Sequence, residues 1–137
     1  MNPEDNVLVF VTAQPSCYRL IQAGAAIAET YHMPLKVVTI QPPGPLSKHA
    51  ADNLQVLYNI SGKLGAEMTI LFNENPALTA AVHAHQTGAK HIVSGSPGGQ
   101  SQLFIEAVRQ LVPEIPWTVV DDQQQAVTFP PLAVVGT

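Results

Sequence analysis

The sequence has little charge. Of its 137 residues, 6 are Lys or Arg and 10 are Asp or Glu, which gives a formal net charge of -4 and a charged fraction of 12%. That fraction is about half the usual quarter. So few basic residues, scattered along the chain, argue against a binder of duplex nucleic acid. They still allow one small anionic ligand, because one or two basic groups and backbone amides can hold it.

Cysteine and long apolar runs are also lacking. Cys17 is the single cysteine, so the chain forms no internal disulfide. No apolar run approaches the ~20 residues that cross a bilayer, which excludes a transmembrane helix. The N-terminus is acidic and polar, unlike a signal peptide. We therefore expect a cytoplasmic protein without a membrane partner, and the sparse surface charge favours self-association.

Apolar patterns predict an α/β fold. Short, β-branched apolar runs typical of doubly buried strands alternate with stripes typical of helices, one of them with Ser16 as its N-cap. Right-handed crossovers then give a three-layer, doubly wound, five-stranded parallel sheet of order 3-2-1-4-5. The predicted strands are 6–12, 35–40, 68–72, 90–94 and 117–120, and the predicted helices are 17 to about 32, 46–64, 76–86 and 102–111.

The chain divides into one domain, residues 1–120, and a C-terminal tail, 121–137. The tail opens with a polar stretch that indicates a linker, followed by two short apolar runs, 126–129 and 132–135, on either side of Pro130-Pro131. In the predicted order the strand 117–120 lies at a sheet edge, which proteins usually cover or pair. We expect the tail to pack on that edge or on a second subunit, and we expect a homodimer through this strand and the tail.

The predicted ligand site is the crevice between strands 1 and 4, where the strand order reverses. Two short loops of small residues lead there into helix N-termini, whose amides and dipole favour an anion such as phosphate. Glycines in such a loop can equally serve a turn. The predicted ligand-binding residues are Thr12, Ala13, Gln14, Pro15, Ser16, Arg19, Gly95, Ser96, Gly98, Gly99, Gln100 and Ser101.

No pattern of residues predicts catalysis or a metal. His83 and His85 are two apart on a predicted helix, so they point to different faces. Asp121-Asp122 is interpreted as a solvated turn away from the crevice, and Cys17 as a small buried residue. No nucleophile, base and oxyanion donor converge by spacing. We therefore expect no enzyme, no catalytic residue, no bound metal and no required cofactor.

Several short motifs resemble the universal stress protein family, in the version found in KdpD-type potassium-responsive sensor kinases. The resemblance covers roughly residues 6–120 and rests on Pro15-Ser16 with Arg19-Leu20, and on 25–29, 64–67, 75–77 and 91–96. It implies the adenine nucleotide alpha hydrolase-like fold, a signalling role with a protein partner, and pairing through the last strand.

The resemblance also implies ligands, adenine nucleotides in the family at large and cyclic di-AMP in some sensor-kinase versions. Gly95 and Gly98 match the first half of the family's nucleotide motif. Val108-Arg109 stands in place of its second half, and Ala13 in place of an Asp, which argues against an ATP site of the usual form. Two alternatives remain open: a module that binds no nucleotide and acts by dimerisation or protein contacts, and a small flavin enzyme, for which no aromatic pair is evident.

Overall fold

A single mixed sheet of order β3-β2-β1-β4-β5-β6 organises the chain. The computed structural model describes residues 5–96 and 100–132, with side chains at 100 and 101 left aside. The strands are β1 (Asn6–Phe10), β2 (Leu35–Gln41), β3 (Glu67–Phe72), β4 (Ala89–Gly95), β5 (Trp117–Val120) and β6 (Ala126–Phe129). The helices are a 3₁₀ turn, η1 (Pro15–Cys17), and α1 (Tyr18–Tyr31), α2 (Lys48–Lys63), α3 (Pro76–Thr87) and α4 (Gln100–Leu111).

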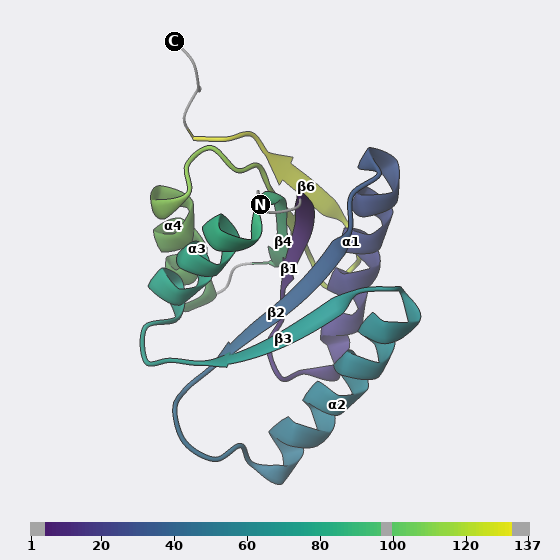
Figure 1. Cartoon of the computed structure of the whole chain (residues 1–137), viewed down its shortest axis with the longest axis vertical. Helices are drawn as coiled ribbons and strands as arrows, with labels where there is room; N and C mark the ends of the chain where they lie inside the picture. Colours follow the sequence, from purple (N-terminus) through teal and green to yellow (C-terminus); the bar gives the residue numbers. More distant parts are fainter. Residues whose placement is uncertain (1–4, 97–99, 133–137) are drawn as a thin grey trace.

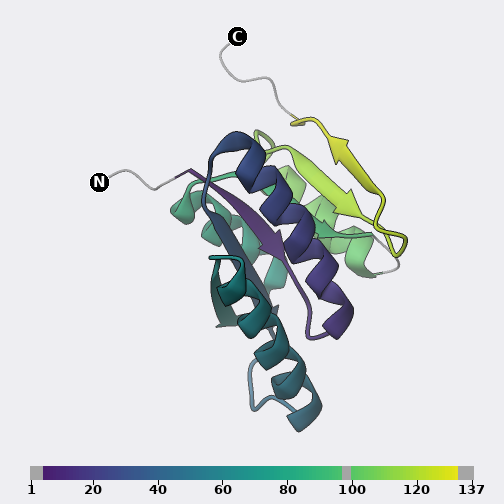
Figure 2. The same cartoon turned by 90° about the vertical axis from the view of Figure 1, so that its right-hand side faces the viewer.

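The predicted order of the first five strands is confirmed, and all four pairings among them are parallel. Helices cover both faces, α1 and α2 on one side and α3 and α4 on the other (Figures 1 and 2). Each face has its own apolar cluster. One gathers Leu20, Ile21 and Leu57 against the sheet, and the other gathers Ala84 and Val108. The three-layer architecture is thus the predicted one.

The prediction of five strands is wrong by one. β6 pairs antiparallel with β5, so β5 is an inner strand and β6 forms the edge (Figure 1). The stretch interpreted as a linker is a tight hairpin turn, in which the Asp121 carboxylate accepts hydrogen bonds from the backbone N–H groups of Gln123 and Gln125, each at 2.9 Å. The tail therefore packs on the sheet edge of its own chain. Most of the second apolar run, 133–135, lies outside the described residues.

Capping side chains explain where the helices begin. Ser47 accepts a hydrogen bond from the Ala50 N–H at 3.1 Å, so α2 begins two residues later than predicted. Asn75 caps α3 in the same way, as predicted. The prediction that Ser16 is the N-cap of α1 is wrong. Pro15 starts a 3₁₀ turn that contains Ser16 and leads into the helix, so Cys17 takes the N-cap position. None of the helices in the described residues is long and apolar enough to cross a bilayer.

A row of polar side chains joins the last three strands, from the buried His91 and Thr118 to the exposed Thr128. His91 Nε2 on β4 lies 2.6 Å from Thr118 Oγ1 on β5, which lies 2.7 Å from Thr128 Oγ1 on β6.

Burial lowers the pKa of His91. His83 behaves alike, since burial and the nearby Lys36 lower its pKa and Glu67 opposes them. Both rings are therefore favoured in the neutral form.

Acid is expected to destabilise the fold through these two histidines. The ordinary pKa of 6.5 applies to the unfolded chain, and the pKa values in the folded protein are lower. At a pH between the folded and unfolded pKa values, the unfolded state therefore binds more protons than the folded state. The contribution of the two neutral histidines to the free energy of unfolding should be complete above pH 6.5. It should be lost as the pH falls from 6.5 through the lower pKa values of the folded protein. Urea unfolding at a series of pH values from 7.5 to 5 measures this. His91→Gln should flatten the curve, and a wild-type curve that is already flat would contradict the expectation.

Candidate functional site

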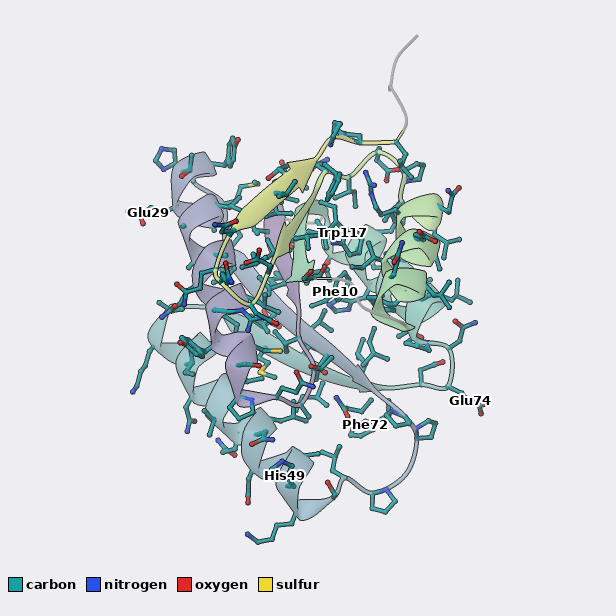
Figure 3. The ribbon with its side chains drawn as sticks, turned by 180° about the vertical axis from the view of Figure 1, so that it is seen from behind. Phe10, Glu29, His49, Phe72, Glu74 and Trp117 are labelled. Atoms are coloured by element: carbon teal, nitrogen blue, oxygen red, sulfur yellow. The ribbon has the colours of Figure 1, made fainter. Side chains whose placement is uncertain are left out.

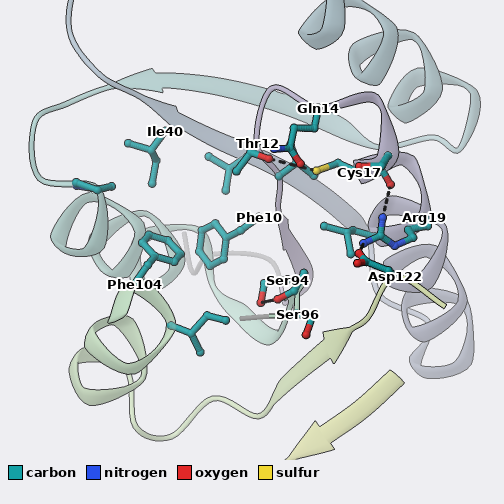
Figure 4. A pocket seen from close by; sticks show the side chains of 17 residues that line it. Phe10, Thr12, Gln14, Cys17, Arg19, Ile40, Ser94, Ser96, Phe104 and Asp122 are labelled. Carbon is teal, nitrogen blue, oxygen red and sulfur yellow. Dashed lines mark hydrogen bonds and ion pairs between the residues drawn. The ribbon is translucent and has the colours of Figure 1, made fainter. Parts of the chain in front are cut away.

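A crevice opens where the carboxyl ends of β1 and β4 lie side by side, at the point where the strand order reverses (Figure 4). Its volume is about 490 Å³. Its walls come from β1, β2 and β4, from the turn between β1 and α1, from the first turns of α1 and α3, from α4 and from the β5–β6 turn. This is the place where ligands bind in open α/β sheets.

Half of the twelve predicted residues line this crevice: Thr12, Gln14, Ser16, Arg19, Gly95 and Ser96. Ala13 and Pro15 belong to the same loop but are not part of the lining. Gly98 and Gly99 lie outside the described residues. Gln100 and Ser101 form the first turn of α4, and their side chains lie outside the described part.

The loop from Thr12 to Cys17 is held by short local bonds. Thr12 C=O accepts from the Gln14 N–H at 2.7 Å, and Gln14 C=O accepts from the Cys17 N–H at 3.1 Å. The side-chain amide of Asn53 on α2 donates to Ala13 C=O at 3.1 Å. Cys17 is buried, as predicted, with its sulfur 3.5 Å from Thr12 Oγ1. The loop is thus fixed from both sides, which leaves the Thr12, Gln14 and Ser16 side chains exposed at the crevice.

Arg19 is anchored at the mouth of the crevice by three hydrogen bonds. Its Nε donates to Asp121 C=O at 3.1 Å, and its two terminal nitrogens donate to Ser16 C=O and to the Asp122 carboxylate, both at 2.9 Å. The interpretation of Asp121-Asp122 as lying away from the crevice is therefore wrong. The β5–β6 turn folds back over α1, and Asp122 becomes part of the lining (Figure 4).

The other end of the crevice is apolar, which the sequence analysis missed. Phe10 and Phe104 meet edge to face, with ring centroids 5.7 Å apart and planes at 89°, and Ile40 lies beside them (Figure 4). Trp117 stacks on Phe10 from the core, at 5.9 Å and 30°, and its Nε1 donates to Ser94 Oγ at 2.8 Å. Figure 3 shows Phe10 and Trp117 together in the interior. An aromatic pair therefore does lie in the crevice.

The histidines lie elsewhere. His83 is half-buried and His85 exposed, so they face different environments on α3. In residues 5–96 and 100–132, no group of three or more His, Cys, Asp or Glu side chains could hold a metal ion. The crevice therefore offers hydroxyls, amides, one guanidinium, one carboxylate and an apolar floor. Such a set suits binding of a small organic ligand with a polar end.

No protein-family model and no curated protein sequence matches the chain. Solved structures do match it. A universal stress protein family member from Burkholderia pseudomallei is 16% identical, with TM-score 0.62 over 83% of this chain and 93% of its own. The universal stress protein from Archaeoglobus fulgidus in complex with dAMP is 22% identical, with TM-score 0.59 over 88% and 97%. A universal stress protein in complex with cAMP is 15% identical, with TM-score 0.64 over 90% and 100%. The fold of this chain is therefore that of the universal stress proteins.

Proposed function

We propose that this domain is a regulatory domain that binds an adenine nucleotide in the crevice between β1 and β4. The observation that carries the proposal is the crevice itself, because an apolar end and a polar end face each other there within about 490 Å³. Sites for small ligands and cofactors commonly measure ~300–1,000 Å³. Two proteins of the same fold hold dAMP and cAMP.

The apolar end suits the base. Phe104 is partly exposed and Ile40 is partly exposed beside it, whereas Phe10 is 93% buried beneath them, being 7% exposed. A flat heteroaromatic ring gains from burial against such side chains and from offset or edge-on contact with an aromatic ring. This floor has no charged group, which favours a neutral base over the phosphate at this end.

The polar end suits the sugar and phosphate. Thr12, Gln14, Ser16 and Ser96 are exposed there and carry hydroxyl or amide donors. The Ser94 hydroxyl is already occupied, since it accepts from Trp117 and donates to the Gly95 C=O at 3.3 Å. We therefore assign ligand contacts to the four exposed side chains and a structural role to Ser94.

We also propose that binding is not followed by catalysis. Among the lining residues of the described chain, the nucleophiles are hydroxyls and the buried Cys17 thiol, and no histidine stands beside them. The one lining carboxylate, Asp122, is paired with Arg19. General base catalysis needs a base within hydrogen-bond reach of the nucleophile. This arrangement supports a sensing role, for which the resemblance to KdpD-type domains adds cyclic di-AMP as a second ligand to test.

The proposal extends to assembly and location. We propose a homodimer, with β6 in place of β5 as the pairing edge, because β5 has neighbours on both sides. Val127 and Phe129 on β6 are 55% and 43% exposed, and an apolar edge favours pairing. We also propose a cytoplasmic location, with which a free cysteine is compatible. A module that acts only through such contacts is the alternative, and it is favoured by the neutralised charge of Arg19.

Thermal shift and calorimetry with AMP, dAMP, cAMP, ATP, cyclic di-AMP and FMN test the ligand. A nucleotide at a hundred times its Kd should stabilise the native state by about 2.7 kcal/mol. Ser96→Trp should abolish this, because it places an indole over the polar end from an exposed position. Gln55→Trp on α2, also exposed and outside the lining, is the matched control. Binding of FMN alone would favour the flavin alternative, and binding unaffected by Ser96→Trp would exclude this crevice.

A further inference from the structure

The crevice is electrically balanced. Arg19 is the one cation and Asp122 the one anion among its lining residues in the described part of the chain, and they are joined at 2.9 Å. The Arg19 side chain is 14% exposed and that of Asp122 is 96% exposed. The charge that an entering ligand meets first is therefore the carboxylate, and the guanidinium behind it is compensated.

Arg19 does not depend on Asp122 for its position. Two of its three hydrogen bonds run to backbone carbonyls, of Ser16 and of Asp121. The Asp121 carbonyl belongs to the turn that the Asp121 side chain itself closes. Loss of the Asp122 charge should therefore leave the guanidinium in place, with its positive charge uncompensated at the crevice mouth.

We propose that Asp122 sets the charge class of the ligand that the crevice accepts. By compensating Arg19, it favours a phosphodiester with one negative charge per phosphate over a nucleoside triphosphate. A phosphodiester needs only neutral donors, such as the hydroxyls of Thr12 and Ser96 and backbone amides. A triphosphate would bring several negative charges against an exposed carboxylate, with no uncompensated cation among the described lining residues. This inference rests on the proposed function and deepens it.

The test compares cAMP, with one charge, and ATP, with about four at neutral pH, on three proteins. Asp122→Asn keeps the shape and an oxygen acceptor for Arg19 and removes one charge. Glu114→Gln, the control, makes the same charge change on an exposed residue just before β5. It lies at the amino ends of the strands, whereas the crevice lies at their carboxyl ends. Wild-type protein should bind cAMP more tightly than ATP. Asp122→Asn should tighten cAMP by about fivefold at low salt and ATP by more, so that the preference narrows or reverses. Glu114→Gln should change both by less than twofold.

The effect should shrink at high ionic strength, because exposed charges are screened. Unchanged or weaker ATP binding by Asp122→Asn, in a protein that binds cAMP, would overturn the role of Asp122 and leave the proposed function standing. A wild-type preference for ATP would overturn it as well. If neither cAMP nor ATP binds to any of the three proteins at millimolar concentration but AMP, dAMP or cyclic di-AMP does, the role of Asp122 is wrong and the proposed function stands. If none of these nucleotides binds, the proposed function is wrong as well. Unfolding curves of the three proteins show that each is folded.

Discussion

Replacing Trp117 with alanine is expected to lower the free energy of unfolding by about 3–5 kcal/mol. Trp117 is fully buried, stacks on Phe10, and donates a hydrogen bond to Ser94. The substitution leaves a large cavity at the centre of the cluster under α3 and α4 and removes the support of Phe10, which forms part of the crevice floor. Because domains of this size have ~5–15 kcal/mol of total stability, the variant should be partly unfolded at 37 °C. Urea unfolding followed by circular dichroism measures the loss.

Trp117→Phe separates the two contributions of the indole. The phenyl ring keeps much of the contact with Phe10 but cannot donate to Ser94, so a loss of about 1–2 kcal/mol is expected. Equal losses in the two variants would mean that packing on Phe10 contributes little. A loss below about 1 kcal/mol for Trp117→Ala would contradict the assignment of Trp117 as a central core residue.

The order of the first five strands could be predicted from the sequence because each of the central strands is buried on both faces. β1 is buried at all five residues, so its apolar run is continuous, and turn residues flank it. β6 could not be predicted in the same way. All four of its residues are exposed, so its apolar content does not distinguish a strand from a linker. Its place depends on the hairpin turn at Asp121, in which the carboxylate that looks like a solvated charge caps two backbone N–H groups.

The two loops of the site could be predicted because topology alone brings the ends of β1 and β4 together. The residues contributed by other elements could not. Phe104 on α4 and Ile40 on β2 are apolar residues like those of the core, and only the packed structure shows that they border a crevice. The sequence does not place Asp122 correctly, because the polar composition of the β5–β6 turn is equally typical of a linker. The error in the fold and the error in the site therefore have one cause.

Removing β6 is expected to change the assembly of the protein more than its fold. A chain that ends at Gln124 loses the whole β5–β6 ladder and the bond from Thr118 to Thr128. It also loses the contact of Arg109 with the Phe129 ring, at 5.5 Å from the centroid. The outer backbone groups of β5 then have no partner, and an exposed strand edge pairs readily with another chain. Sedimentation velocity at high micromolar concentration should show larger species and lower solubility than for the full chain.

A second truncation, after Pro131, is the matched control because it removes tail residues but keeps β6 and its contact with Arg109, including the hydrogen bond from Arg109 to Pro130 C=O at 2.8 Å. It should sediment like the full chain, for which we expect a dimer through the β6 edge.

The row of polar side chains explains why removal of β6 should cost the fold itself little. Thr118 keeps His91 as a partner when Thr128 is gone, so His91 is not left as an unsatisfied buried group. Two expectations would be contradicted if the full chain sediments as a monomer and the Gln124 truncation behaves identically. One is the dimer, and the other is that β6 keeps the edge of β5 from pairing with another chain. If the full chain is a monomer and the Gln124 truncation aggregates, the expected dimer is wrong. The other expectation, that β6 covers the edge of β5 in its own chain, would then stand.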